Sequence, residues 1–191
     1  DKLLSKNIEN SKNKLYPIIS DVIKSNIEKN NTSLYRYNEL CFLHLRSGDI
    51  NCHKLDHFVT NPLSYYHWLR KYFKKIIIVT EPGKDHLLLA EIIKIFDVIE
   101  IKRSKEFIKD FSFLANCQNL ATSGVSTFPI AASIFNKNLK NFYSSNIYLR
   151  EHLNPTFLSL NVKKYEYQCN EYWETWFNIN PEKRKNLIFE S

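Results

Sequence analysis

The sequence Leu40-Cys41-Phe42-Leu43-His44-Leu45-Arg46-Ser47-Gly48-Asp49 changes character at Arg46. It begins as an apolar run rich in strand-forming residues and ends in a polar turn. Core packing does not explain the arginine, glycine and aspartate of that turn. In an open α/β sheet, ligands bind outside the carboxyl ends of the strands. We therefore expect a strand over residues 39–45 and a binding site where it ends.

Two further strands are expected to end in polar turns. The run Lys75-Ile76-Ile77-Ile78-Val79-Thr80 is β-branched after its lysine, which is typical of a strand buried on both faces of a parallel sheet. It leads into the turn Thr80-Glu81-Pro82-Gly83. The third turn, Ser123-Gly124-Val125-Ser126-Thr127, follows a short strand predicted at residues 119–122. All three turns should line one edge of the sheet.

The rest of the chain alternates short apolar runs with helical patterns. Further strands are expected over residues 98–101 and 139–143. Helices are expected over 63–73, with Pro62 in the first turn, over 85–96, over 104–117 with Ser104 as its cap, and over 127–135. This alternation predicts an α/β fold with a Rossmann-like, mostly parallel sheet flanked by helices.

The length of 191 residues accommodates one full domain and appendages. We expect a helical segment over 1–35, containing an amphipathic helix at 13–29, a Rossmann-like domain over 36–150, and a helical, aromatic-rich tail over 151–191. The aromatic side chains of the tail either pack back onto the domain, which we favour, or form an acceptor-binding patch. Because the chain begins at Asp1 and lacks methionine, we expect it to be part of a longer protein, whose missing domain could hold half of the site.

Composition narrows the class of partner and the compartment. The formal net charge is +7, but the lysines are dispersed along the chain, which favours a solvated surface over a nucleic-acid interface. Cys41 and Cys117 lie in apolar runs and are expected to be buried free thiols in a reducing compartment, although one disulfide remains open. No apolar run approaches 18 residues, so no membrane span is expected. These features predict a cytoplasmic protein, and peripheral association with a membrane remains open.

A metal site is not expected from the sequence. His53, Asp56 and His57 lie close together in an irregular segment, but no third ligand follows at a useful spacing. We favour loop histidines over metal ligands there. The four cysteines form no C-x-x-C pair, and no Asp-x-Asp follows a strand. We therefore expect neither a metal nor a cofactor.

The turn that contains Gly124 has the chemistry of a phosphate cradle. Gly124 would allow close approach of the backbone, while Ser126 and Thr127 would offer hydroxyls and amides at a helix N-terminus. Small residues before a helix often serve only as an N-cap, so this motif is weak alone. Arg46 in the neighbouring turn strengthens it, because a guanidinium group matches a diphosphate bidentately.

The motifs also resemble those of a known family. His44-Leu45-Arg46-Ser47-Gly48-Asp49 resembles the H-x-R-x-G-D motif of GDP-fucose-dependent fucosyltransferases, the superfamily of α-1,2-, α-1,6- and protein O-fucosyltransferases. Residues 110–117 and 123–128 resemble its later motif, in which an acidic residue opens a helix and a serine-rich turn follows. Residues 77–81 are similar to its middle strand. The resemblance covers residues 40–136, with the motifs in the right order.

This resemblance implies the donor-binding half of a GT-B glycosyltransferase that works without a metal. Arg46 would hold the β-phosphate, Asp110 would face guanine, and His44 would line the pocket or brace the arginine. Negative charge develops on the leaving diphosphate, so an arginine and a helix N-terminus can replace a cation. The candidate catalytic residues are Arg46 and Asp49. The candidate donor-binding residues are His44, Arg46, Gly48, Thr80, Glu81, Asp110, Ser123, Gly124, Ser126 and Thr127.

The sequence departs from the family at two places. Ser47 stands where many relatives of the α-1,2 enzymes carry a second basic residue, and Phe128-Pro129 replaces their aromatic continuation. We expect an inverting transferase that moves fucose from GDP-fucose to a glycan or polysaccharide. A different nucleotide-sugar donor and a non-catalytic nucleotide- or glycan-binding module remain the alternatives. The acceptor, the linkage, the catalytic base and the oligomeric state do not follow from the sequence.

Overall fold

The computed structural model describes residues 39–51, 58–147 and 161–191, together with Asp21, Ser25 and Leu158. The predicted helix at 13–29 lies outside the described residues except for Asp21 and Ser25. His53, Asp56, His57 and Cys52 also lie outside them.

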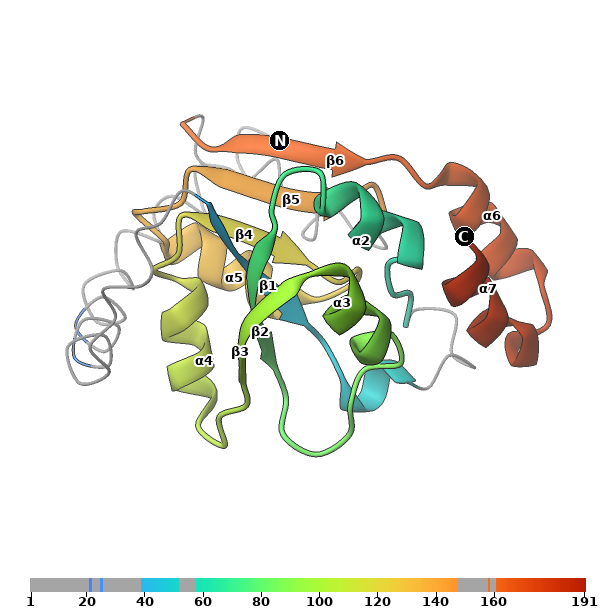
Figure 1. The fold of residues 1–191 in the computed structure, drawn as a ribbon, viewed down its shortest axis with the longest axis horizontal. Coiled ribbons are helices and arrows are strands. Elements are labelled where there is room, and N and C mark those ends of the chain that lie inside the picture. Colours follow the sequence, from blue (N-terminus) through green and yellow to red (C-terminus); the bar gives the residue numbers. More distant parts are fainter. Residues whose placement is uncertain (1–20, 22–24, 26–38, 52–57, 148–157, 159–160) are drawn as a thin grey trace, which may run out of the picture.

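A single sheet of six parallel strands forms the centre of the fold (Figure 1). Its strands are β1 (Leu40–Leu45), β2 (Lys75–Thr80), β3 (Asp97–Lys102), β4 (Asn119–Thr122), β5 (Asn141–Ser145) and β6 (Lys163–Tyr167). Every pairing between neighbours is parallel. The predicted α/β class and Rossmann-like sheet are confirmed.

The strand order is β3-β2-β1-β4-β5-β6. The chain builds outward from β1 through β2 to β3, and then returns to place β4 on the other side of β1. The direction of winding therefore reverses between β1 and β4. In open parallel sheets the crevice at such a reversal, at the carboxyl ends of the strands, is where ligands bind. The turns after β1, β2 and β4 meet at this edge, as the sequence predicted.

Helices cover both faces of the sheet. They are α2 (Leu63–Leu69), α3 (Leu89–Ile95), α4 (Phe107–Leu114), α5 (Thr127–Phe135), α6 (Asn170–Asn178) and α7 (Arg184–Glu190), with 3-10 turns η2 (Gly48–Asn51) and η5 (Pro181–Lys183). Cys41, Leu43 and Leu45 of β1 belong to a core shared with α2, α3, α6 and α7. Leu40 and Phe42 belong to a second core, shared with α4 and α5. The period of two along β1 thus supplies one core for each face.

The sheet extends beyond residue 150, into the segment predicted as a helical tail. β6 pairs with β5, and Tyr165 stacks on Tyr143 with ring centroids 4.6 Å apart. The alternation of charged residues with tyrosine in Lys163–Tyr167 is a strand pattern that the prediction of a helical tail overlooked. The helical part of that prediction applies to α6 and α7. Tyr172 and Trp176 of α6 are buried in the core, so these aromatics do pack back onto the domain.

Helix boundaries differ from the predicted ones where local turns compete with the helix. α4 begins at Phe107 rather than Ser104, because the Ser104 hydroxyl accepts the Glu106 N–H at 3.0 Å and Glu106 is extended. This start places Asp110 in the first turn of α4. α2 ends at Leu69 rather than at residue 73 and α3 begins at Leu89 rather than at 85, whereas α5 has the predicted bounds.

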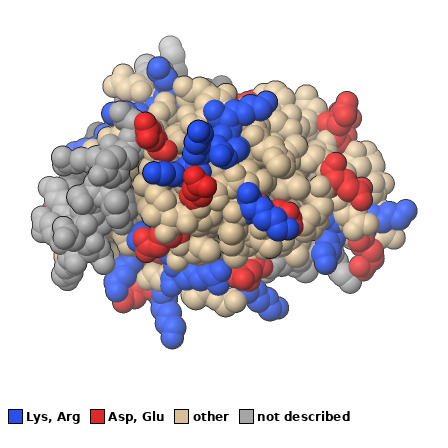
Figure 2. Space-filling view, viewed as in Figure 1, with Lys and Arg blue, Asp and Glu red and all other residues tan. Residues whose placement is uncertain are grey.

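The surface carries charges of both signs. On the face shown in Figure 2, Lys and Arg side chains are interspersed with Asp and Glu, as expected for a solvated surface. Cys41, Cys117 and Cys169 are buried free thiols. Among the described residues, no helix has the length and apolar character needed to cross a membrane.

Candidate functional site

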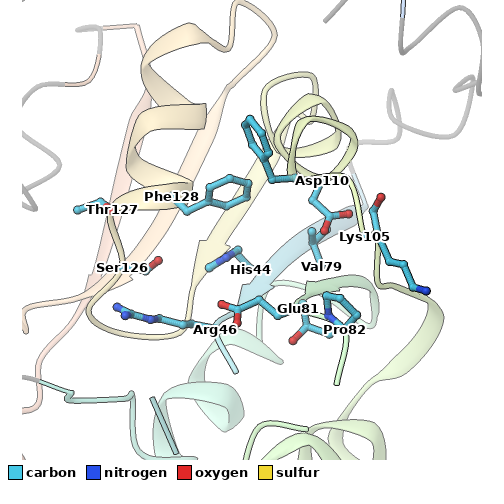
Figure 3. A pocket seen from close by; sticks show the side chains of 13 residues that line it. His44, Arg46, Val79, Glu81, Pro82, Lys105, Asp110, Ser126, Thr127 and Phe128 are labelled. Atoms are coloured by element: carbon cyan, nitrogen blue, oxygen red, sulfur yellow. The ribbon is translucent and has the colours of Figure 1, made fainter. Parts of the chain in front are cut away.

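A cleft of about 410 Å³ opens at the carboxyl ends of β1 and β2, between α4 and α5 (Figure 3). Seven of the candidate residues line it, namely His44, Arg46, Thr80, Glu81, Asp110, Ser126 and Thr127. Gly48, Asp49, Ser123 and Gly124 do not line it. The structure thus brings residues from three separate turns and a helix to one cavity, which is the arrangement expected of a ligand site in this fold.

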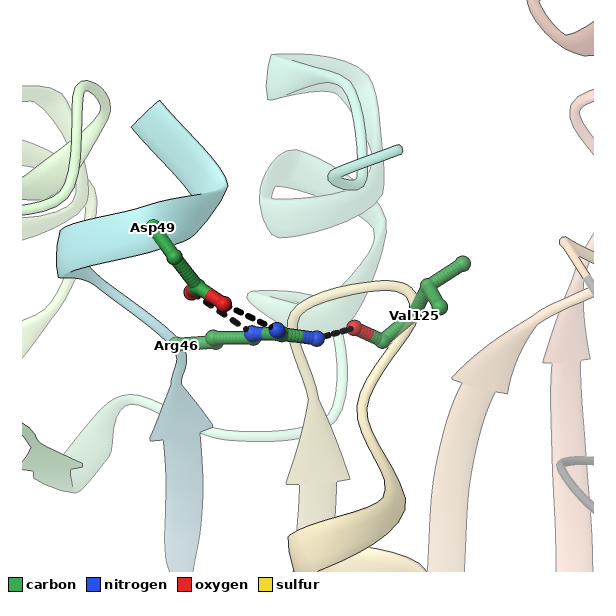
Figure 4. Close-up of polar contacts among 3 residues, drawn as sticks. All are labelled: Arg46, Asp49 and Val125. Atoms are coloured by element: carbon green, nitrogen blue, oxygen red, sulfur yellow. Dashed lines mark hydrogen bonds and ion pairs between the residues drawn. The ribbon is translucent and has the colours of Figure 1, made fainter. Parts of the chain in front are cut away.

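Arg46 is held in place from two sides (Figure 4). Its Nε donates to Asp49 Oδ1 at 3.0 Å and its Nη2 to Asp49 Oδ2 at 2.5 Å, while Nη1 donates to the Val125 carbonyl at 3.0 Å. A guanidinium group has five N–H donors, so one on Nη1 and one on Nη2 are left for a ligand. The hydrogen bonds from Arg46 hold the pKa of Asp49 below its usual range. Asp49 was predicted to be catalytic, but its observed contact is to orient Arg46.

The turn after β4 is fixed by a neighbouring segment of backbone. The Asn61 N–H donates to the Ser123 carbonyl at 2.9 Å, and the Val125 N–H donates to the Val59 carbonyl at 3.1 Å. Gly124 has φ 115°, and a Cβ there would lie 2.7 Å from the Val59 oxygen. The sequence prediction gave Gly124 the role of letting a phosphate approach. The approach observed is instead that of residues 59–61.

Ser123 links this turn to the turn after β1. Its hydroxyl accepts the Arg46 N–H at 3.0 Å. At the end of β2, the Thr80 hydroxyl donates to Ser47 Oγ at 3.1 Å. Gly48 has φ 64°, and a Cβ on it would lie 3.0 Å from Glu81 Oε2. These residues therefore hold the turns against one another and set the shape of the cleft.

The N-terminus of α5 faces the cleft with unused donors. Ser126 is extended, with φ −158° and ψ 131°, and its side chain does not cap the helix. The N–H groups of Thr127 and Phe128 donate to no group among the described residues, and Pro129 has no N–H. The positive end of the helix dipole adds to these donors. This end of α5 is suited to an anionic group.

Asp110 forms part of the opposite wall, on α4. Its side chain is buried, and Oδ1 has no hydrogen-bond partner within the described part of the chain. Burial raises the pKa of Asp110 to about 6, against the opposing effects of the Ser104 N–H and of Lys102. A buried carboxylate oxygen without a donor is costly. A ligand that brings an N–H to Oδ1 would remove that cost.

His44 forms part of the floor of the cleft. It is buried on β1, 5.4 Å from the Phe128 ring, and Nδ1 has no partner among the described groups. Burial, together with the smaller effect of the charge on Arg46, lowers the pKa of His44 to about 3, so the ring is neutral at neutral pH. The hydrogen bonds that brace Arg46 come from Asp49 and Val125. Of its two expected roles, His44 therefore has that of lining the pocket.

Glu81 lies at the entrance, beside Arg46 in Figure 3. Partial burial raises the pKa of Glu81, and Asp49 raises it further, while Arg46 opposes both. The charged lining residues are therefore Arg46 and Lys105 on the positive side and Glu81 and Asp110 on the negative side. A ligand that carries both an anionic group and hydrogen-bond donors matches this mixture.

Several lining residues were not predicted from the sequence, namely Val79, Pro82, Ser104, Lys105, Phe107 and Phe128. Ser104 and Lys105 lie in the connection after β3, a fourth strand end at the same edge. Applying the strand-end rule to that strand as well would have found them. Phe107 lies three residues before Asp110 on α4, and that helical spacing was available in the sequence.

Comparisons with models of protein families, with curated proteins and with solved structures give no match for this chain. Within the described residues, no group of three or more His, Cys, Asp and Glu side chains is placed to hold a metal ion.

Proposed function

We propose that this chain binds a nucleoside-diphosphate sugar in the cleft and serves the transfer of its sugar to a glycan or polysaccharide acceptor. GDP-fucose is the donor that we favour, from the resemblance of residues 40–136 to fucosyltransferases. The observation that carries the proposal is the pairing of unused donors with an unused acceptor across one cavity. Arg46 and the amides of α5 offer N–H groups, and Asp110 Oδ1 lacks one.

The wall of the cleft that offers free N–H groups suits the diphosphate. The two remaining N–H groups of Arg46 and the free amides of Thr127 and Phe128 are charged or dipole-assisted donors, which favour phosphate oxygens. When the bond between the sugar carbon and the diphosphate oxygen breaks, the diphosphate gains negative charge. Donors that are already fixed in place stabilise this charge without reorganising. The bidentate contact with Asp49 supplies that fixed position for Arg46.

The α4 wall, where the Asp110 carboxylate lacks a hydrogen-bond donor, suits guanine. An ionised carboxylate accepts two parallel hydrogen bonds from N1 and N2 of guanine, which uracil and adenine cannot donate in that pattern. The wrong base would leave the buried oxygen unpaired, and such a loss discriminates strongly between ligands. The pKa of Asp110, near 6, leaves the carboxylate ionised at neutral pH.

The test is titration calorimetry with GDP and UDP on the parent and on Arg46→Ala. We expect the parent to prefer GDP and Arg46→Ala to bind it at least tenfold more weakly, because a charge-assisted hydrogen bond contributes about 1.5–3 kcal/mol. Arg70→Ala is the matched control, since Arg70 also donates to a backbone carbonyl, that of Ile95 at 2.8 Å, but lies outside the cleft. Circular dichroism monitors folding.

Two results of the binding experiment would count against the proposal. Equal loss of GDP affinity in Arg46→Ala and Arg70→Ala would assign Arg46 a structural role, and a parent that binds no nucleoside diphosphate would reject the site.

Turnover is followed as release of GDP from GDP-fucose, with and without excess chelator. We expect release to persist with chelator. Loss on chelation, with recovery on adding Mn²⁺, would replace the metal-independent mechanism, and binding without turnover would identify a binding module.

A further inference from the structure

Phe107 is the most exposed large apolar side chain among the described residues, at 74%. It begins α4 and lines the cleft. The other phenylalanines of this helix have partners. Phe111 lies 5.7 Å from the Phe128 ring, and Lys102 Nζ lies 4.1 Å from the Phe113 ring. Phe107 has no such ring contact within the described part of the chain, so its face is available at the mouth of the cleft.

Phe107 and Asp110 are three residues apart on one helix, a spacing that places side chains on the same face. They combine an open aromatic surface with a buried carboxylate oxygen that lacks a donor. A planar heterocycle with N–H groups along one edge can satisfy both at once, since its face stacks and its edge donates. A sugar hydroxyl or a phosphate would use only one of the two.

We propose that Phe107 is the stacking platform for the nucleobase and, with Asp110, fixes its position in the cleft. This inference rests on the proposed function, because it assumes that the ligand is a nucleotide. Stacking on an aromatic side chain tolerates any base, whereas the carboxylate distinguishes among bases. Phe107 should therefore control affinity for nucleotides in general, and Asp110 the preference for guanine.

The test compares GDP with inorganic pyrophosphate, which has no base, on the full 191-residue chain. Phe107→Ala should weaken the binding of GDP about tenfold, a typical loss for one stacked base. Pyrophosphate affinity is measured by displacement of a fluorescent GDP analogue and is corrected for the affinity of each variant for that analogue. This corrected pyrophosphate affinity should be the same in the parent and in Phe107→Ala. Phe107→Trp should retain GDP affinity, because it keeps an aromatic face. Phe177→Ala is the matched control, since Phe177 is 42% exposed but lies on α6.

Each remaining outcome is decisive. If the parent binds GDP and Phe107→Ala binds it equally well, the platform is rejected while the proposed function stands. An equal loss of GDP and pyrophosphate would reject it too, by showing that the start of α4 is distorted. A parent that binds neither compound would reject the proposed function and this inference with it. If Phe107→Ala loses affinity for GDP but not for pyrophosphate, and Phe107→Trp keeps its affinity for GDP, the platform is supported.

Discussion

The two walls of the cleft differ in how their polar groups are satisfied. On the wall formed by the turns after β1 and β4, protein contacts fix the key groups. The Arg46 side chain donates to Asp49 and to the Val125 carbonyl, and the Ser123 hydroxyl accepts the backbone N–H of Arg46. On the α4 wall, Asp110 Oδ1 is buried without a donor and Phe107 is exposed without a ring partner among the described residues.

This difference separates preorganisation from binding potential. Groups already bonded within the protein keep their positions when charge develops on a ligand, which is what electrostatic catalysis needs. Unsatisfied groups lower the stability of the empty protein and are satisfied when a ligand arrives. We therefore expect changes in the residues that hold the first wall in place, such as Gly124, to affect mainly folding. Changes in Arg46, which keeps two N–H groups for a ligand, and in the α4 wall should affect mainly binding.

The largest effect is expected from Gly124→Ala. The new Cβ would meet Val59 O at 2.7 Å and Asn61 N at 2.9 Å, both of them backbone atoms, at a φ of 115°. We expect a loss of roughly 3 kcal/mol or more in the free energy of unfolding, through overpacking and backbone strain. In thermal denaturation this corresponds to a fall in Tm of about 10 °C for a chain of this size.

Gly83→Ala is the matched control for that substitution. Gly83 has φ 112°, close to that of Gly124, but a Cβ there would meet nothing within 4 Å. Only the backbone strain remains, so the loss should be about 1 kcal/mol. Similar losses in the two variants would show that residues 59–61 do not clamp the turn.

A smaller loss is expected from Tyr172→Phe. The Tyr172 hydroxyl donates to the Thr60 carbonyl at 2.7 Å, and the Thr60 hydroxyl donates to the Ser123 carbonyl at 3.0 Å. α6 thus supports the segment that clamps the turn after β4. Deleting the buried hydroxyl should cost about 1–2 kcal/mol in urea denaturation, because an acceptor is left unpaired.

Tyr72→Phe serves as the comparison for Tyr172→Phe. Tyr72 is 45% exposed, so removing its hydroxyl should change stability by less than about 0.5 kcal/mol. If both tyrosine variants were equally stable, the contact of α6 with Thr60 would not contribute to the fixed wall.

The arrangement of the sheet could be predicted because its signals are local. A buried β-branched run such as Lys75–Thr80 indicates a parallel strand, and the rule for strand ends then places the polar turns together. Short-range competition was harder to predict. The Ser104 hydroxyl accepts the Glu106 N–H in a turn, and α4 therefore begins at Phe107. The strand Lys163–Tyr167 was missed for another reason, because its pairing with β5 and the stack of Tyr165 on Tyr143 are contacts between separate segments.

The division of roles within the site could not be predicted, because it depends on contacts between distant segments. Nothing near Gly124 in the sequence indicates that residues 59–61 cross beside it. Asp49 was named as a candidate catalytic residue from its place in the motif with Arg46, and its bidentate contact with Arg46 is visible only in three dimensions. Residue type identified the members of the site, and tertiary contacts assigned their roles.

The smallest effect on stability is expected from Asp110→Asn. This substitution should stabilise the folded chain at neutral pH, whereas Gly124→Ala and Tyr172→Phe should destabilise it. Burial raises the pKa of Asp110 from 3.8 to about 6 in the folded chain. Between these pH values the folded state holds a proton that the unfolded state has lost, so this group's contribution to stability falls as pH rises through the window. Above pH 6 the buried charge costs about 1 kcal/mol, allowing for partial solvent screening.

Asp110→Asn should therefore unfold at a higher temperature than the parent at pH 7.5 and at nearly the same temperature at pH 4. Asp97→Asn, at an exposed carboxylate on β3, is the control and should show the same difference from the parent at both pH values. GDP affinity should change in the opposite sense, rising more steeply between pH 5 and 7 in the parent than in Asp110→Asn. The terminal phosphate of GDP ionises in this range for both proteins, and only the parent gains the ionised carboxylate as well. A stability difference between the parent and Asp110→Asn that does not vary with pH would show that burial does not destabilise the ionised Asp110 carboxylate. The α4 wall would then not hold an unsatisfied charged group, and it would not differ from the first wall in this respect.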